Sequence, residues 1–238
     1  MEAIILAGGL GTRLRSIVSD LPKPLAPIRD RPFLAYLLDF WINQGVNRFV
    51  LSVGYKYETI QKKFGNQYKG AEIDYAVETT PLGTGGGLIL SSKKLRSPEP
   101  FLILNGDTFF NVNLIDLLKH HSTCEADITL SLVEISDNKR YNSAVLDDKG
   151  FVRSLEKRSK TSQSNWANGG VYVMTPNLLQ EYTNHHDKNC SLEDELLPDL
   201  LRKKRRVAGF ISSGGFVDIG SPEDYLRARE ILFRDHGN

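Results

Sequence analysis

A glycine loop directly after the first apolar segment constrains this chain more than any other feature. Ala3–Leu6 is apolar, and three of the four residues in Gly8–Gly11 are glycine. Because glycine has no Cβ, backbone N–H groups in such a loop can approach a polyphosphate closely, and Arg13 and Lys23 add positive charge nearby. The pattern predicts a buried strand that ends in a nucleotide-handling loop.

The spacing of the glycines argues against two common nucleotide-binding loops. A dinucleotide-binding loop needs G-x-G-x-x-G, and Leu14 stands where the third glycine belongs. A P-loop needs G-K-[ST], which does not follow. An oxidoreductase would also need an acid about 20 residues further on, at the end of a second strand, whereas the next predicted strand ends near Val53. The oxidoreductase reading is therefore the weaker alternative.

Apolar segments alternate with helical stretches through the first half of the chain. The predicted strands are Ala3–Leu6, Arg48–Val53, Glu72–Val77, Phe101–Leu104 and Asp127–Leu132. One helix is expected to begin at Pro32 and stop at Gly45. Another is expected over Asn113–His121, with His120 and His121 in a solvated last turn. This alternation is typical of a parallel sheet covered by helices.

The second half of the chain adds antiparallel features. Ser143–Leu146 and Phe151–Leu155 flank the turn sequence Asp147–Gly150, which predicts a hairpin, and Asn165–Val173 returns to strand character. Lys203–Arg206 is interpreted as a helix end and solvated edge, not as a binding site.

The composition of the chain limits the classes of binding partner that can be expected. The 238 residues include 30 Lys and Arg against 29 Asp and Glu, so the net charge of +1 gives no reason to expect a nucleic acid or a membrane as partner. Cys124 and Cys190 lack metal-ligand spacing and are expected to be free thiols in a reducing compartment. With no signal-like start and no apolar run of about 20 residues, we expect a cytoplasmic protein of one domain, residues 1–238, acting on small molecules.

Two aspartates follow apolar strand-like segments. Asp107 comes after Phe101–Leu104 and Asn105–Gly106, and Asp218 lies in Phe216–Gly220. Ligands of open α/β sheets bind at the carboxyl ends of the strands, where Asp107 is expected. Mg²⁺ commonly takes one or two protein carboxylates and fills its other positions with phosphate oxygens and water. The sequence therefore predicts that Asp107 and Asp218 converge on Mg²⁺.

A second glycine cluster, Pro81–Gly87, is expected to open a helix. So many glycines weaken a helix, which favours a flat group such as a nucleobase against the backbone. Glu78, shortly before the cluster, could accept hydrogen bonds from guanine N1–H and N2–H₂. Glu193 is chemically suited to binding sugar hydroxyls, although its alternative is a simple helix N-terminal acid.

Taken together and in this order, GGLGTR, LPKP, LGTGGG, NGDTFF, EK, NGG and VDIG resemble the sugar-1-phosphate nucleotidyltransferases over nearly the whole chain. The resemblance implies a Rossmann-like three-layer α/β/α fold with a mixed, mainly parallel central sheet and an added antiparallel sugar-binding portion. It also implies transfer of a nucleoside monophosphate to a sugar 1-phosphate with release of pyrophosphate. Within the family, TTPLGTGGG and LNGDTFF are most similar to guanylyltransferases acting on a heptose 1-phosphate.

The same resemblance implies roles for individual residues. Arg13 and Lys23 would be catalytic, and Asp107 and Asp218 would hold Mg²⁺. The nucleotide would contact Leu6, Ala7, Gly8, Gly9, Gly11, Thr12, Arg13, Lys23, Glu78, Pro81, Gly83 and Thr84. The sugar phosphate would contact Asn105, Gly106, Glu156, Lys157, Asn168, Gly169, Gly170 and Glu193. Uridylyl, thymidylyl or cytidylyl transfer to a hexose or N-acetylmuramic acid phosphate, a non-catalytic nucleotide sensor and a homo-oligomer all stay open.

Overall fold

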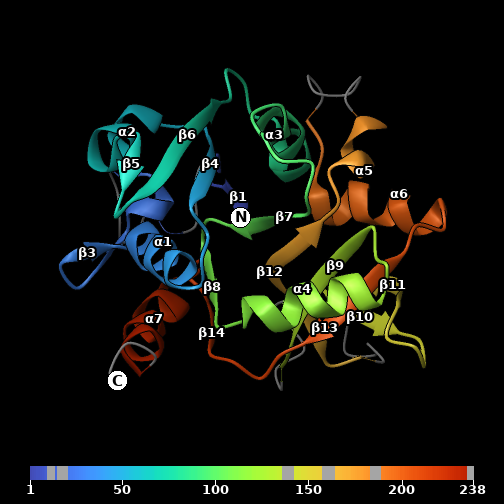
Figure 1. Ribbon diagram of the computed structural model, residues 1–238. Coiled ribbons are helices and arrows are strands. Elements are labelled where there is room, and N and C mark those ends of the chain that lie inside the picture. The colour runs from blue at the N-terminus through green and yellow to red at the C-terminus, as the bar shows by residue number, and fades with distance from the viewer. Residues whose placement is uncertain (10–13, 15–20, 136–141, 157–163, 183–188, 235–238) are drawn as a thin grey trace.

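A ten-stranded mixed sheet organises the molecule in the computed structural model, which describes residues 1–9, 14, 21–135, 142–156, 164–182 and 189–234 (Figure 1). Its strands are β1 (Glu2–Leu6), β4 (Arg48–Val53), β5 (Gln67–Tyr68), β6 (Ala71–Val77), β7 (Phe101–Asn105), β9 (Ile128–Glu134), β10 (Ser143–Leu146), β11 (Val152–Glu156), β12 (Trp166–Met174) and β13 (Val207–Ile211). The helices are α1 (Phe33–Asn43), α2 (Tyr57–Phe64), α3 (Gly83–Ser92), α4 (Leu114–Thr123), α5 (Asn177–Gln180), α6 (Leu197–Arg202) and α7 (Pro222–Arg234), with a 3₁₀ turn η2 (Lys23–Leu25) and a π-helical turn η4 (Leu192–Leu196).

The sheet has a parallel half and an antiparallel half. Strands β7, β1, β4 and β6 are parallel neighbours, which confirms the alternation read from the sequence. Strand β12 then pairs antiparallel with both β7 and β9, and the β10–β11 hairpin extends this side. The expected mixed, mainly parallel sheet with an added antiparallel portion is confirmed.

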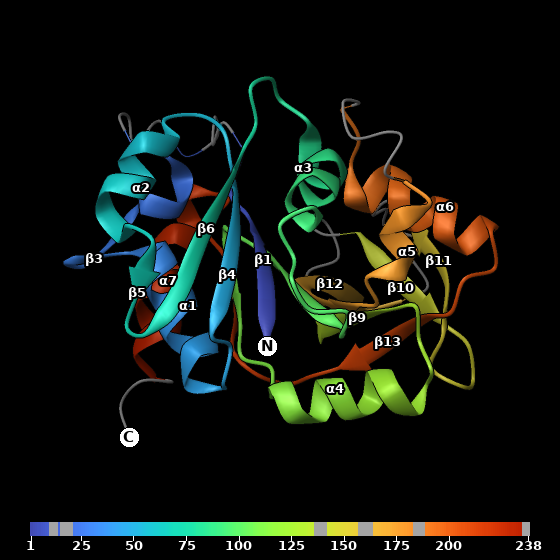
Figure 2. The same ribbon diagram turned by 45° about the horizontal axis from the view of Figure 1, so that its top comes forward.

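Helices cover both faces of the sheet, because its parallel strands are apolar on both faces (Figures 1 and 2). Ala3 and Ile5 of β1 pack into one core with α1, α4 and α7, whereas Ile4 packs into the other with α3 and α6. This alternation along one strand produces the three-layer α/β/α architecture.

Two short strand pairs lie outside the main sheet. Strand β2 (Pro27–Ile28) pairs with β3 (Arg31–Pro32), and β8 (Thr108–Phe110) pairs antiparallel with β14 (Phe216–Asp218). The second pair joins segments more than 100 residues apart in the chain and places Thr108 opposite Asp218.

The prediction of a solvated histidine pair in α4 is half wrong. His121 is only 4% exposed, and its Nδ1 lies 2.8 Å from the Thr129 hydroxyl of β9. His121 follows Leu114 and Leu117 on the buried stripe of α4, so it faces the sheet. Burial lowers the pKa of its imidazole below the usual value.

No helix among the described residues has the length and apolar character needed to span a membrane. Both cysteines are free thiols, as expected from their spacing.

Candidate active site

A cavity of about 320 Å³ opens at the carboxyl ends of β1, β4 and β7. Such an edge is where open α/β sheets bind their ligands. The lining combines residues from several separate chain segments: Leu6, Ala7, Gly8, Gly9, Lys23, Pro24, Ser52, Glu78, Pro81, Gly83, Thr84, Asn105, Gly106, Asp107 and Asn189. The sequence analysis assigned a set of residues to nucleotide binding, and every one of them that the structure describes borders this cavity.

The glycine loop lies against an acidic side chain. A Cβ on Gly8 would overlap the carboxylate of Glu78, so only glycine allows this approach. Glu78 is held in place because the Ser52 hydroxyl donates to its Oε1 (3.0 Å) and the Leu82 N–H donates to its Oε2 (3.1 Å). A carboxylate has about four acceptor positions, so Glu78 keeps the capacity to accept further hydrogen bonds from a group in the cavity.

The second glycine cluster does open helix α3, but Gly85 serves a different purpose from the expected one. A Cβ on Gly85 would stand 2.8 Å from Cys190 Sγ, and the Gly85 N–H donates to the Cys190 carbonyl (2.9 Å). Gly83 has φ +70° and also abuts that carbonyl. Of the cluster's glycines only Gly83 borders the cavity, so close packing of α3 on the segment before η4 explains Gly85, and the nucleobase explanation is wrong there.

Asp107 and Asp218 converge on one cation. Lys23 Nζ lies 2.5 Å from Asp107 Oδ2 and 3.9 Å from Asp218 Oδ1. The fold brings them together because β14 pairs with β8, which begins directly after Asp107, and the Ile219 N–H donates to the Asp107 carbonyl (2.9 Å). The predicted convergence of the two aspartates is therefore present.

The two carboxylates carry more negative charge than Lys23 neutralises. Burial, followed by repulsion from Asp107, raises the pKa of Asp218 to about 6, even though Lys23 and the Gly220 N–H (2.6 Å) act in the opposite direction. The Asp218 side chain keeps 29% of its surface exposed and Asp107 38%. A further cation at this position would lower the electrostatic cost of the pair.

The donor set suits a hard cation that is shared with phosphate oxygens. Among the described residues, no group of three or more His, Cys, Asp or Glu side chains comes together in a way that could hold a metal ion. Two carboxylates alone are sufficient for Mg²⁺, which fills its octahedron with water and substrate oxygens. The residues therefore fit the predicted magnesium site and do not resemble a closed structural site.

A hydrogen-bonded chain of side chains links the cavity to the antiparallel half of the sheet. The hydroxyl of the fully buried Tyr172 accepts from Asn168 Nδ2 (2.7 Å) and donates to Glu193 Oε1 (3.2 Å). The Thr84 hydroxyl donates to Glu193 Oε2 (2.7 Å) and accepts from the Leu192 N–H (2.8 Å). Burial raises the pKa of Tyr172 well above its usual value, so its hydroxyl stays protonated and donates. The chain thus fixes the Glu193 carboxylate next to cavity-lining Thr84.

Gly169 and Gly170 stand where the pairing of β12 with β9 shifts register. A Cβ on Gly169 would overlap the Phe110 ring, and Gly170 has φ +71° with Asn105 Nδ2 3.0 Å from the position of its missing Cβ. Both glycines are thus needed for packing next to the cavity-lining Asn105.

Some predicted residues stay untested. Gly11, Thr12, Arg13 and Lys157 lie outside the described residues. Glu156 ends β11, opposite Ser143, and does not border the cavity.

The sequence interpretation also missed Ser52, Tyr172 and Asn189. Ser52 had a visible signal, since it is the one polar residue near the carboxyl end of the apolar strand Arg48–Val53.

Comparison with known proteins agrees with this geometry. The chain is 42% identical to D-glycero-alpha-D-manno-heptose 1-phosphate guanylyltransferase from Aneurinibacillus thermoaerophilus, over 98% of each chain. It is 38% identical to the protein of the same name from Campylobacter jejuni, over 94% of this chain and 97% of the relative. The crystal structure of HddC from Yersinia pseudotuberculosis complexed with GMP-PN superposes with a TM-score of 0.83 at 34% identity, over 96% of this chain and 98% of that one. Because the nucleotidyl transferase family model also matches residues 2–234, the chain belongs to the nucleotidyl transferase family.

Proposed function

We propose that this protein transfers GMP from GTP to D-glycero-α-D-manno-heptose 1-phosphate and releases pyrophosphate, forming a nucleotide sugar for surface polysaccharide synthesis. The observation that carries the proposal is the convergence of the glycine loop, Glu78 and Asp107 on one cavity beside Asp218. Near-full-length similarity to two heptose 1-phosphate guanylyltransferases supports the choice of substrates.

In the proposed reaction, an oxygen of the sugar phosphate attacks the α-phosphorus of GTP in line with the departing pyrophosphate. The attacking phosphate is already ionised at neutral pH, so the protein supplies no general base. Its task is to bring two polyanions together and to stabilise the charge on the leaving group.

The residues at the cavity divide this task. We assign recognition of the base to Glu78, whose carboxylate can accept hydrogen bonds from guanine N1–H and N2–H₂. The ribose is assigned to the backbone of Ala7–Gly9. Lys23, 12% exposed, carries the positive charge nearest the two aspartates. Asp107 and Asp218 would hold Mg²⁺, which supplies Lewis-acid stabilisation of phosphate oxygens when bound. Arg13 and Lys157 keep their predicted roles at the triphosphate and the sugar phosphate.

The acceptor half of the site is proposed at the antiparallel edge of the cavity. Glu193 is held by three hydroxyl donors, from Thr84, Tyr172 and Ser191, so its remaining acceptor positions are fixed in direction. We assign the sugar hydroxyls to Glu193, Asn168, Gly169 and Gly170, which lie next to the cavity-lining Thr84 and Asn105. Gly106 borders the cavity and is assigned to the same half, whereas Glu156, which does not border it, keeps its role only as a prediction from the resemblance.

An assay of the purified chain tests the proposal. It pairs GTP, UTP, TTP, CTP and ATP with heptose, mannose, glucose and N-acetylmuramic acid 1-phosphates, and measures pyrophosphate release and the nucleotide sugar by mass spectrometry. We expect the highest kcat/KM for GTP with the heptose phosphate. Turnover with UTP or TTP alone would overturn the guanylyl assignment, and the absence of any product would favour a nucleotide-sensing subunit.

A further inference from the structure

A second concave site lies away from the cavity described above, between the turn of the β10–β11 hairpin and the connection from α6 to β13. This basic groove has a volume of about 620 Å³. Its lining residues are Asp147, Lys149, Phe151, Val152, Arg153, Leu201, Lys204, Arg205, Arg206 and Val207. Five cationic side chains thus face one acidic side chain.

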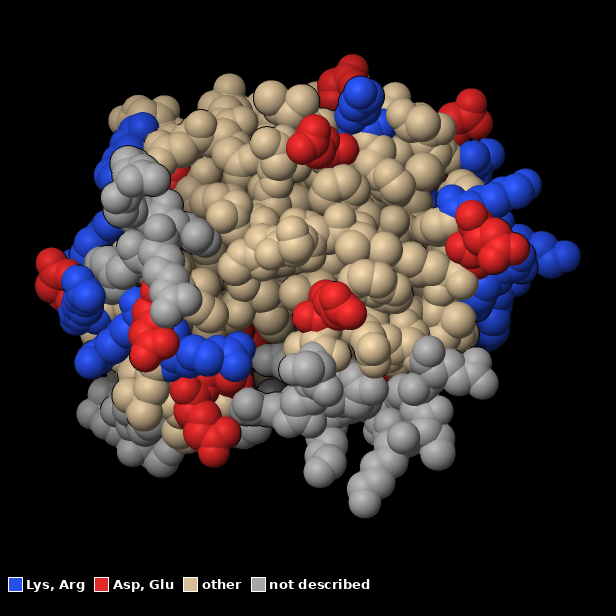
Figure 3. All heavy atoms as spheres, turned by 90° about the horizontal axis from the view of Figure 1, so that it is seen from below, with Lys and Arg blue, Asp and Glu red and all other residues tan. Residues whose placement is uncertain are grey.

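Figure 3 shows Lys and Arg side chains at the right and left edges of the face seen from below, with Asp and Glu among them, while the described part of the centre of that face carries few charges. The lining of the basic groove has more cationic than acidic side chains, although the whole chain has a net charge of only +1. A local excess of one sign in a concave, partly apolar setting raises the local concentration of oppositely charged ligands.

The charges of the basic groove fall into two groups. Each of the three arginines has an acidic partner: Arg153 pairs with Asp147 (3.2 Å), Arg205 with Glu181, and Arg206 with Glu125 (3.4 Å). Lys149 and Lys204, both exposed, have no ion pair within 4.0 Å among the described residues. The two ammonium groups are therefore available to an anion that enters the groove.

The walls of the groove are fixed relative to each other. The Gly209 N–H donates to the Gly150 carbonyl (2.9 Å), and Phe151 forms an antiparallel bridge with Ala208. The Arg206 guanidinium lies 5.4 Å from the centre of the Phe151 ring. A groove that is formed in advance in this way loses little free energy to ordering when a ligand binds.

The backbone at Lys204 is also unusual. Lys204 has φ +56° directly after the end of α6, a conformation that glycine adopts more easily than residues with a side chain. A lysine at this turn places a charge at the groove in a backbone conformation that a Cβ disfavours.

We propose that the basic groove is a second binding site, specific for a small soluble ligand that carries two or more phosphate groups, such as a nucleoside diphosphate or triphosphate. The paired arginines keep N–H donors that suit phosphate oxygens, and the unpaired lysines supply the net charge. The half-buried side chains of Phe151 and Leu201 give the ring or sugar of such a ligand an apolar surface. Its concave shape and volume fit a small molecule better than the flat surface of a membrane.

The test is an NMR titration of the ¹⁵N-labelled full chain with inorganic tripolyphosphate. We expect one set of shifted amide signals at residues 149–153 and 204–209, separate from a set at residues 7–9 and 105–108. In the Lys149→Ala/Lys204→Gly variant the groove set should need about tenfold more ligand, while the other set is unchanged. Lys204→Gly is chosen because glycine tolerates the backbone conformation, so the fold is retained.

A matched control replaces two exposed lysines elsewhere, Lys62 on α2 and Lys119 on α4, by alanine and should titrate like the unmodified chain. Repeating the titration with GDP, and with vesicles of phosphatidylglycerol and phosphatidylcholine, distinguishes a soluble ligand from a lipid headgroup. Groove signals that do not shift with tripolyphosphate, that shift equally in both variants, or that respond only to the anionic vesicles would overturn the proposal.

Discussion

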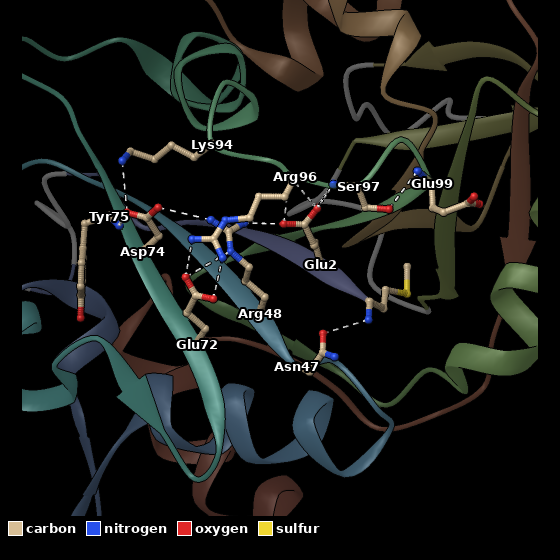
Figure 4. Close-up of polar contacts among 11 residues, drawn as sticks. Glu2, Asn47, Arg48, Glu72, Asp74, Tyr75, Lys94, Arg96, Ser97 and Glu99 are labelled. Carbon is tan, nitrogen blue, oxygen red and sulfur yellow. Dashed lines mark hydrogen bonds and ion pairs between the residues drawn. The ribbon is translucent and has the colours of Figure 1, made fainter.

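The two ends of the parallel sheet each carry a cluster of charged side chains, and the clusters differ in their balance. The amino-end cluster consists of Glu2, Arg48, Glu72, Asp74, Lys94 and Arg96 (Figure 4). The carboxyl-end cluster consists of Lys23, Asp107 and Asp218. Among the residues that the structure describes, three acids meet three bases in the first cluster, and two acids meet one base in the second.

At the amino end, each charged side chain has at least one partner of opposite charge. Buried Arg48 of β4 pairs with Glu2 of β1 and lies 3.3 Å from Asp74 of β6, so one side chain ties three neighbouring strands. Glu2 also accepts the backbone N–H groups of Arg96 and Ser97 (both within 2.9 Å). The hydrogen bond from Arg96 lowers the pKa of Glu72, and this effect outweighs the opposite effect of desolvation.

At the carboxyl end, charge is left over. Asp218 has a raised pKa, whereas Glu72 and, despite its partial burial, Asp74 have lowered ones. The difference indicates that the amino-end cluster, with equal numbers of acids and bases, holds strands together. The carboxyl-end cluster has an excess of negative charge beside a cavity and is suited to binding a cation.

The largest expected effect is on turnover at the unbalanced cluster. Asp107→Asn and Asp218→Asn should each lower kcat/KM by at least about 100-fold, because each removes a ligand of the proposed Mg²⁺. Neither should lower the melting temperature of the metal-free protein, since each relieves repulsion between two carboxylates. Pyrophosphate release and thermal unfolding measure both, and near-normal turnover in Asp107→Asn would remove it from the metal site.

The reverse pattern is expected at the balanced cluster. Arg48→Met leaves Glu2 and Asp74 without their shared partner and should lower the free energy of unfolding by about 3 kcal/mol, with turnover per folded molecule retained. Urea denaturation followed by circular dichroism measures the loss. The control is Arg227→Met on α7, an arginine that is 52% exposed and should change stability little. Equal losses in both variants would contradict the contrast.

Glu193 differs from the carboxylates of both clusters, because its hydrogen-bond donors are hydroxyl groups and not cations. Tyr172→Phe removes one of those donors without changing the ring and should raise the KM for the sugar phosphate by about fivefold to tenfold. The KM for GTP should change much less, because the Tyr172 hydroxyl positions Glu193, which is assigned to the sugar phosphate and not to the nucleotide. Steady-state kinetics with each substrate varied separately decides, and an equal rise in both KM values would indicate a general structural effect.

A smaller effect concerns the pH dependence of stability. Because burial lowers the pKa of His121, the unfolded chain binds more protons than the folded one once pH falls below about 6.5, so stability should decrease from pH 7.5 to pH 5.5. His121→Gln should weaken that decrease. The measurement is best made in an Asp218→Asn background, since Asp218 titrates near pH 6 with the opposite sign. If His121→Gln left the pH dependence of stability unchanged, His121 would not be the group responsible for the decrease.

The smallest effect is expected at the solvent-exposed rim of the amino-end cluster. Arg96 donates to both carboxylate oxygens of Glu72 (2.8 and 2.6 Å), but its side chain is 62% exposed. Water and salt screen such a pair, so Arg96→Ala should leave the melting curve within experimental error of the unmodified chain. A clear loss of stability would show that the rim contributes as the buried Arg48 does.

Local patterns in the sequence predicted most of the parallel half of the fold. Strand Arg48–Val53 has the predicted bounds, and Gly45 stops α1 with φ +96° as expected. These elements are defined by apolar runs and turn residues that act over a few positions. Their pairing order could be predicted because helices between strands favour parallel neighbours.

Long-range contacts explain what was missed. The three-residue strands β8 and β14 are too short to show a pattern, and the use of Gly85 depends on Cys190, more than 100 residues later. His121 was placed in solvent because its polarity outweighed its position on the buried stripe of α4. The convergence of Asp107 and Asp218 could be predicted from motifs, whereas the hydrogen bonds of Tyr172 could not, because it lies in a strand whose neighbouring residues are apolar. The single-domain expectation stays a prediction, which the continuous sheet supports.

The late position of Asp218 has a consequence for how the enzyme is made. Since β14 completes the acidic pair only by joining β8, a ribosome must add the more than 100 residues that separate Asp218 from Asp107 before the second carboxylate can reach the first. A nascent chain that contains only β1, β4 and β7 holds Asp107 without Asp218, and so one of the two carboxylates proposed for Mg²⁺.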